Sequence, residues 1–197
     1  GNVHHGGRLE IGPDGFLYAT IGDASNPDLA QEPQSKNGKI IRLNANNEWE
    51  TVSLGHRNPQ GLAWNEDGEL FASEQGQTAH DEINKIEEGG NYGWPLIEGD
   101  EEREGLVTPL LHSGANETCA PSGMTFHQGK LYVAALRGEC ALVANTDTRE
   151  LEDKITGFGR IRDVFSNGEE LFFVTNNRDG RGTPAADDDK LYQLVEK

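Results

Sequence analysis

The chain has 197 residues, 34% of them hydrophobic and 25 of them glycine, a composition typical of one loop-rich β domain rather than of a helical one. Its 34 acidic and 17 basic residues give a formal net charge of −17, which disfavours nucleic acids and anionic membrane surfaces as partners. No apolar stretch approaches the roughly 18 residues that a membrane-spanning helix needs. We therefore expect a soluble protein with no nucleic-acid partner and no membrane span.

One pattern recurs four times: a strand of alternating polarity, a turn that contains glycine, and a second, more apolar strand. The copies span residues 7–20, 60–72, 122–134 and 161–174. Their turn glycines are Gly15, Gly68, Gly129 and Gly168. A further strand is expected after each copy, at 38–43, 82–86, 140–144 and 190–195. Each repeat is thus predicted to be one antiparallel sheet, and a radial array of such sheets is a β-propeller.

The spacing of the turn glycines brackets the roughly 40 to 50 residues of a propeller blade, so about four blades fit in the chain. We predict an all-β fold that forms a single domain over residues 1–197. Four blades leave sheet edges exposed unless further blades close the array. The chain starts with Gly1-Asn2-Val3-His4-His5, without an initiating methionine or a leader. This start favours the C-terminal part of a larger propeller whose N-terminal blades are absent here.

Two cysteines flank the third hairpin. Cys119 precedes its first strand and Cys140 follows its second, so both are expected at the same end of the sheet. A disulfide and a pair of buried free thiols are both compatible with this placement.

Polar residues gather where the first strand of each hairpin begins and the second strand ends. These two positions share one end of an antiparallel hairpin, so the blades should bring them together at one rim. Before the first strands stand His4, Arg57 with Asn58, Thr118, and Arg160 with Arg162. After the second strands stand Asp23, Gln75 with Gly76 and Asp81, Arg137, and Asn176 with Asn177. Four of only ten arginines converge there, which favours a planar or multiply anionic ligand, because guanidinium groups bind carboxylates through paired hydrogen bonds.

Each of these residues also has an ordinary structural interpretation. Arg57 could be a loop cation paired with a neighbouring carboxylate, and His4 could belong to an exposed terminus. Asp23 suits a turn whatever its function. The functional interpretation therefore rests on the joint placement of the residues.

Short motifs along the chain resemble the glucose/sorbosone dehydrogenase family. They are HHGGRL at 4–9, GHRNPQGL at 55–62, EQG at 74–76 with DEIN at 81–84, GNYGWP at 90–95, APSG at 120–123, LRG at 136–138 and RIRDV at 160–164. Their order matches the family from the first residue to the last. The family comprises soluble aldose sugar dehydrogenases that use pyrroloquinoline quinone (PQQ) and calcium. The resemblance implies a six-bladed propeller, of which about four blades are present here.

The resemblance also implies roles for individual residues. His4 matches the catalytic base that removes the proton of the sugar's C1 hydroxyl while a hydride passes to PQQ, which gives a lactone. The positions that match cofactor contacts are Arg57, Asn58, Gln75, Asp81, Thr118, Arg137, Arg160 and Arg162. Arg160 and Arg162 would bind the carboxylates of PQQ, and Arg137 stands where some members have lysine.

Two calcium positions follow from the same resemblance. The backbone carbonyls of Gly76 and Gln77 match the catalytic Ca²⁺ site, although Gln77 replaces a proline that is frequent there. Glu82 and the carbonyl of Tyr92 match a second, structural Ca²⁺ site.

The expected partners are an aldose substrate, an external electron acceptor and the missing N-terminal blades, which could be a second polypeptide. We expect a periplasmic or secreted location, and no activity from these 197 residues alone. A non-catalytic ligand-binding propeller of the same family is one alternative, disfavoured by His4, Arg57, Arg160 and Arg162. A calcium-dependent hydrolase of the lactonase kind is another, disfavoured because its channel needs converging carboxylates rather than arginines.

Overall fold

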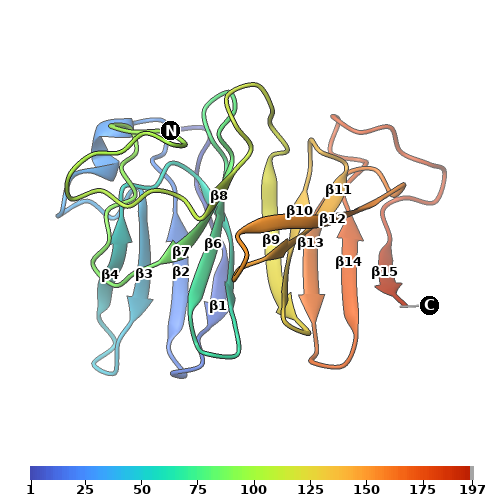
Figure 1. The fold of residues 1–197 in the computed structure, drawn as a ribbon, viewed down its shortest axis with the longest axis horizontal. Coiled ribbons are helices and arrows are strands. Elements are labelled where there is room, and N and C mark those ends of the chain that lie inside the picture. Colours follow the sequence, from blue (N-terminus) through green and yellow to red (C-terminus); the bar gives the residue numbers. More distant parts are fainter. Residues whose placement is uncertain (196–197) are drawn as a thin grey trace.

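The computed structural model describes residues 1–195, and these form four antiparallel sheets (Figure 1). The first contains β1 (Leu9–Ile11), β2 (Leu17–Ile21), β3 (Lys39–Leu43) and β4 (Trp49–Leu54). The second contains β5 (Pro59–Trp64), β6 (Leu70–Glu74), β7 (Glu82–Ile86) and β8 (Leu111–His112). The third contains β9 (Pro121–His127), β10 (Lys130–Ala135), β11 (Cys140–Asn145) and β12 (Glu150–Thr156). The fourth contains β13 (Ile161–Ser166), β14 (Leu171–Thr175) and β15 (Leu191–Leu194).

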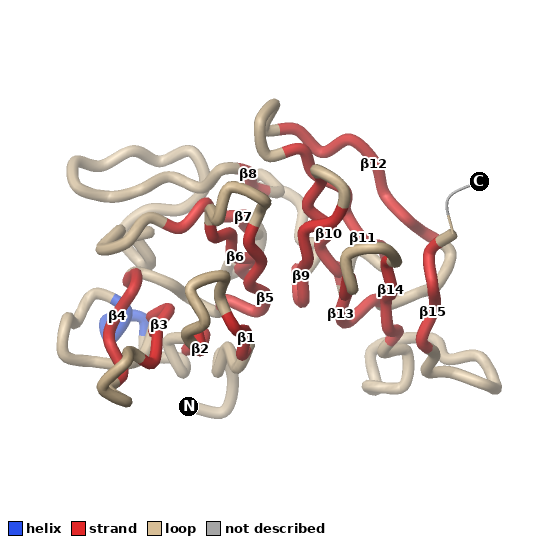
Figure 2. The backbone as a smooth tube through the Cα atoms, turned by 90° about the horizontal axis from the view of Figure 1, so that it is seen from below, coloured by secondary structure: helices blue, strands red, loops and turns tan. Residues whose placement is uncertain are grey.

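The sheets are arranged as the blades of a propeller. Neighbouring strands in each sheet follow one another in the chain. Figure 2 shows the first strands β1, β5, β9 and β13 on the inner side of an arc, with the later strands fanning outward. This arrangement confirms the predicted all-β, propeller-type fold. Among residues 1–195, no helix has the length and apolar character that a bilayer crossing requires.

Alternation along the strands builds one core on each side of a blade. In β6, Leu70 and Ala72 pack against the first sheet, together with Tyr18 and Ile40. Phe71 lies between them in sequence and packs the other way, against the third sheet. Because successive side chains of a strand point to opposite faces, one apolar strand can serve two neighbouring blades. Blade packing therefore fixes the relative position of the strand ends.

The fourth strand of the first three sheets was not predicted. Strand β12 is exposed along almost its whole length, and its sequence ELEDKIT lacks an apolar alternation. Strand β8 has only two residues. Backbone hydrogen bonds to a neighbouring strand hold both of them in the sheet. Their side-chain patterns do not predict this pairing.

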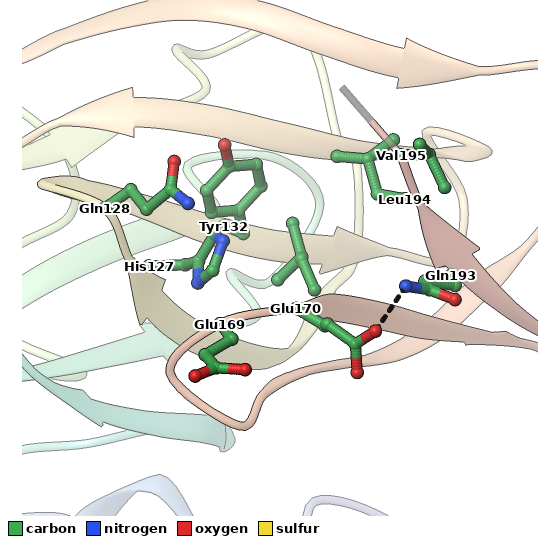
Figure 3. Close-up of a pocket in the computed structure, with 9 residues that line it drawn as sticks. His127, Gln128, Tyr132, Glu169, Glu170, Gln193, Leu194 and Val195 are labelled. Carbon is green, nitrogen blue, oxygen red and sulfur yellow. Dashed lines mark hydrogen bonds between the residues drawn. The ribbon is translucent and has the colours of Figure 1, made fainter. Parts of the chain in front are cut away.

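The two ends of the blades differ. Hairpin turns lie along the lower edge in Figure 1, and the long connectors 22–37, 99–119 and 176–189 lie along the upper edge, here called the site rim. At the turn end, a cavity of about 210 Å³ opens between the third and fourth sheets, lined by His127, Gln128, Glu169 and Glu170 among others (Figure 3). Because its lining includes none of the predicted site residues, this cavity is separate from the predicted site.

A buried lysine joins one long connector to the first sheet. The Lys39 side chain is fully buried, and its ammonium donates hydrogen bonds to the carbonyls of Leu29 (3.0 Å), Ala30 (2.8 Å) and Asn37 (2.8 Å). Leu29 and Ala30 belong to the short 3-10 helix η1 (Pro27–Ala30). Burial lowers the pKa of Lys39 to about 8. The connector that forms part of the site rim is therefore held by one side chain from the core.

We expect Lys39→Met to lower the free energy of unfolding by about 3 kcal/mol, because three carbonyls would lose their charged donor. Urea unfolding at neutral pH measures the change. Lys36→Met is the matched control, since Lys36 is exposed and, within residues 1–195, its ammonium donates only to the carbonyl of Trp49. A loss no larger for Lys39→Met than for Lys36→Met would contradict the prediction.

Candidate active site

A neutral histidine stands at the site rim. His4 Nδ1 lies 2.9 Å from Asp23 Oδ1, and His4 Nε2 lies 3.0 Å from Arg57 Nη2. A guanidinium can only donate and a carboxylate can only accept, so Nδ1 holds the proton and Nε2 presents its lone pair. The two partners thus select one neutral tautomer, which leaves a basic nitrogen at the rim.

Asp23 is buried and fully engaged. Its Oδ1 also accepts the backbone N–H of Ser25 (2.8 Å), and its Oδ2 accepts the indole N–H of Trp94 (2.9 Å). His4 itself has a left-handed backbone with φ 59, and a side chain on Gly22 would overlap the His4 carbonyl. The close approach of the two segments therefore requires glycine at position 22. These contacts fix the orientation of the His4 ring from both sides.

Arg57 connects this histidine to the second sheet. Its Nη1 donates to the carbonyl of Gln75 (2.9 Å), and its guanidinium lies 5.4 Å from the ring centroid of Trp94. Its Nε is buried without a hydrogen-bond partner. Burial lowers the pKa of Arg57. A desolvated guanidinium with one unused N–H is suited to bind an anion or a carbonyl oxygen.

The main cavity at the site rim has a volume of about 510 Å³, within the usual size range of ligand pockets. The structure brings nine of the predicted residues into its lining: His4, Arg57, Gln75, Gly76, Gln77, Asp81, Thr118, Arg137 and Arg160. Ala120, Leu136 and Arg181 complete it. Residues from all four repeats therefore meet at one mouth, as the hairpin argument predicted.

Asp81 anchors two walls of the main cavity. Its Oδ1 accepts the N–H of Gly76 (3.0 Å), and its Oδ2 accepts the N–H groups of Cys119 (2.6 Å) and Ala120 (2.9 Å). This side chain is 4% exposed. Its carboxylate therefore fixes the loop that carries Gly76 and the turn before β9.

Two predicted cofactor-binding residues lie outside the lining of the main cavity, and a third lines it but is already paired. Asn58 is buried and lies outside the lining of the main cavity, where its Nδ2 donates to Gln75 Oε1 (3.1 Å). Arg162 also lies outside that lining and contacts Ser122 Oγ at 3.3 Å. Arg160 lines the cavity but forms an ion pair with Asp179 (2.7 Å), which lowers the pKa of that carboxyl. Any carboxylate that bound Arg160 would compete with Asp179.

A smaller cavity of about 20 Å³ adjoins the first and is large enough for one ion or water. Glu82 and Tyr92, the predicted structural calcium position, line it together with Glu74 and Glu98. Desolvation and then the neighbouring Glu74 raise the pKa of Glu82 to about 8. On the same strand, Asn84 Oδ1 is buried without a partner. A bound cation would stabilise the ionised form of Glu82 and could take the unused amide oxygen as a ligand.

Sequence reasoning gave no role to several residues of this region. The sequence predicts Asp23 at the rim without a specific role, and Trp94 stands there only within the GNYGWP motif at 90–95. Asp179 and Arg181 lie in the last long connector, where no pattern distinguishes them. Asp179 pairs with Arg160, which lies 19 positions earlier, so only the folded chain shows this contact.

The two cysteines meet as predicted, at a cavity of about 250 Å³ between the second and third sheets. Both are free thiols. Desolvation, with Asp81 as the next cause, raises the pKa of Cys119 to about 12, and burial also raises the pKa of Cys140. Of the two alternatives, the structure therefore has free thiols.

The fold and the site together define a β-propeller domain with a cationic ligand cavity at one rim. The sequence profile of the glucose/sorbosone dehydrogenase family matches residues 1–186, and the chain belongs to that family. This membership confirms the resemblance inferred from the motifs.

Individual relatives agree with the family match. The chain is 39% identical to quinoprotein glucose dehydrogenase B of Acinetobacter calcoaceticus over 146 residues, which cover 58% of this chain and 30% of that protein. It is 30% identical to an aldose sugar dehydrogenase of Escherichia coli over 211 residues, 90% of this chain and 55% of that protein. The PQQ-bound aldose sugar dehydrogenase of Streptomyces coelicolor superposes with a TM-score of 0.89 at 37% identity, over 97% of this chain and 61% of that one. The chain thus spans roughly a third to a half of these two curated relatives.

The raised pKa of Glu82 predicts a pH dependence of stability. In the metal-free protein, folded Glu82 keeps its proton up to about pH 8, whereas the unfolded carboxyl loses it near 4.5. The contribution of Glu82 to the free energy of unfolding is therefore fully present below pH 4.5 and is lost as the pH rises through about 8. We expect the stability of wild type relative to Glu82→Gln to fall by more than about 1 kcal/mol between pH 5 and pH 8.5. Urea unfolding in chelator measures this difference, and the exposed Glu66→Gln should show none.

Proposed function

We propose that the protein that contains this chain is a PQQ-dependent aldose sugar dehydrogenase, which oxidises the C1 hydroxyl of a sugar to a lactone. The observation that supports this most directly is the neutral His4, whose Nε2 lone pair is held at the main cavity by Arg57. A base in this state can accept a hydroxyl proton at neutral pH. The identities of the relatives support the substrate class and the cofactor, since they include a glucose dehydrogenase, aldose sugar dehydrogenases and a PQQ-bound structure.

The main cavity fits a flat, multiply anionic cofactor. Arg57, Arg137, Arg160 and Arg181 all line it, in a chain of strongly negative net charge. The buried, unpartnered Nε of Arg57 is a donor that a quinone oxygen or carboxylate would satisfy. When bound, PQQ would supply the two-electron acceptor for the hydride, which no side chain of this chain provides. Arg162 and Asn58 would act from the surrounding layer rather than from the wall of the cavity.

The chain's own residues would orient the sugar and move one proton. His4 Nε2 would accept the proton of the sugar's C1 hydroxyl. To do so, the hydroxyl must replace Arg57 Nη2 as the hydrogen-bond donor to that nitrogen. Asp23 keeps the other ring nitrogen protonated throughout and stabilises the charged imidazolium that forms. Arg57 stays tethered through Gln75 and Trp94, so it remains beside the reacting atoms.

Calcium binding is part of the proposal. The carbonyls of Gly76 and Gln77 would hold a catalytic Ca²⁺ at the main cavity, and Glu82 with the carbonyl of Tyr92 would hold a second Ca²⁺ in the small cavity. Within residues 1–195, no three His, Cys, Asp or Glu side chains converge to hold a metal ion. Both ions would therefore depend largely on carbonyl and amide oxygens, which are ordinary ligands for Ca²⁺. The raised pKa of Glu82 and the unpartnered Asn84 Oδ1 support the second position.

Other parts of the proposal concern the whole protein. Closure into six blades, with the N-terminal blades in the same or a second polypeptide, stays a prediction. An external electron acceptor and a periplasmic or secreted location also stay predictions, as does the inactivity of these 197 residues alone.

The test is sugar-dependent reduction of a redox dye by the complete gene product, supplied with PQQ and Ca²⁺. We expect His4→Asn to lower kcat by about 10²-fold or more, because the proton acceptor is removed. His5→Asn is the matched control, since His5 is the exposed neighbour and should keep kcat within about twofold. Wild type that neither binds PQQ nor oxidises any aldose would overturn the proposed function.

A second variant tests the tautomer. In Asp23→Asn the amide can turn an N–H toward Nδ1, which would place the ring proton on Nε2 and remove the basic lone pair. We expect kcat to fall by about 10²-fold or more. The variant should remain folded at the assay temperature, as its melting temperature will show. The exposed Asp28→Asn serves as control. Equal kcat values for the two variants would show that Asp23 has no such role.

A further inference from the structure

A chain of three buried polar side chains adjoins Arg57. Ser53 Oγ lies 2.8 Å from His56 Nε2, and His56 Nδ1 lies 2.8 Å from Glu74 Oε2. Their exposures are 0%, 0% and 3%, and none of the three lines the main cavity. His56 also stacks on the ring of Tyr92, with centroids 4.9 Å apart.

This arrangement resembles a hydrolytic triad in composition, but it cannot act as one. A serine nucleophile must reach its substrate, and Ser53 has no exposed surface. Burying three polar groups costs free energy unless every one of them is satisfied. Each of these three side chains has a hydrogen-bond partner. Their role therefore depends on what the second carboxylate oxygen of Glu74 binds.

Glu74 holds the backbone of the Arg57 segment. Its Oε1 accepts the N–H of Arg57 and the N–H of Asn58, the latter at 3.1 Å. The carbonyl of Arg57 in turn accepts the N–H of Asp23 at 2.8 Å. Arg57 therefore acts on both ring nitrogens of His4. Its side chain contacts Nε2, and its backbone holds Asp23, which contacts Nδ1.

We propose that His56 and Glu74 are positioning residues for the His4 base. His56 orients the Glu74 carboxylate, Glu74 fixes the main chain of Arg57, and Arg57 sets the geometry at His4. This inference rests on the proposed function, because its effect is on proton abstraction by His4. It adds that the precision of the site depends on side chains that touch neither substrate nor cofactor.

The test is a double-mutant cycle in the complete gene product. We expect His56→Asn to lower kcat by about 10-fold to 10²-fold, because small displacements of a catalytic group are costly. In an Arg57→Ala background the same change should lower kcat by a smaller factor, because the route through the guanidinium to His4 Nε2 is gone and only the main-chain hold on Asp23 remains. KM for the sugar should change little in either case.

His127→Asn is the matched control. His127 is also buried and bonds to a serine, with Nδ1 2.7 Å from Ser166 Oγ, but it lies at the turn end of the blades (Figure 3). It should lower the melting temperature without changing kcat. Equal effects of His56→Asn in both backgrounds would overturn the positioning role. A loss of kcat in His127→Asn as large as that in His56→Asn would also overturn it.

If His56→Asn does not fold, Ser53→Ala tests the same chain with a smaller change. We expect kcat to be about fivefold lower in the wild-type background and to fall by a smaller factor in the Arg57→Ala background. An unchanged kcat in Ser53→Ala would overturn the inference. The absence of all sugar oxidation in wild type would instead overturn the proposed function, so the two failures are distinguishable.

Discussion

The contact between the Arg57 guanidinium and the His4 imidazole is the interaction on which the rest of the site depends. It joins the connector before β1 to the loop before β5, and it assigns the protonation state of the histidine through the donor-only character of arginine. Asp23, Gln75 and Glu74 each hold one side of this pair. The surrounding sheets supply the rigidity that keeps two otherwise mobile side chains at bonding distance.

The same pair shows how stability and function are divided in this fold. The apolar strands between blades provide the favourable burial, whereas the site rim concentrates groups that are costly to bury. Arg57 has an unpartnered N–H, Glu82 has a raised pKa, and Asn84 has an unused oxygen. These costs lie where a cofactor or a cation would relieve them, so ligand binding should also stabilise the folded protein.

Much of the fold could be predicted from the sequence because the hairpins repeat with clear turn glycines and alternating strands. The gathering of His4, Arg57 and Arg137 followed from strand direction alone. The pairing of Arg160 with Asp179 could not be predicted, because Asp179 lies in an irregular connector. The roles of His56 and Glu74 were equally hidden, since one looks like a loop residue and the other like a strand end until the two are seen bonded across 18 positions.

The two cysteines have a practical consequence for chemical modification of this protein. Only a thiolate reacts quickly with maleimides and iodoacetamides, and the raised pKa values of Cys119 and Cys140 keep both sulfur atoms protonated at neutral pH. A maleimide or iodoacetamide reagent would therefore react faster with a new cysteine on an exposed turn than with Cys119 or Cys140. Site-specific labelling should be feasible with both native cysteines left in place.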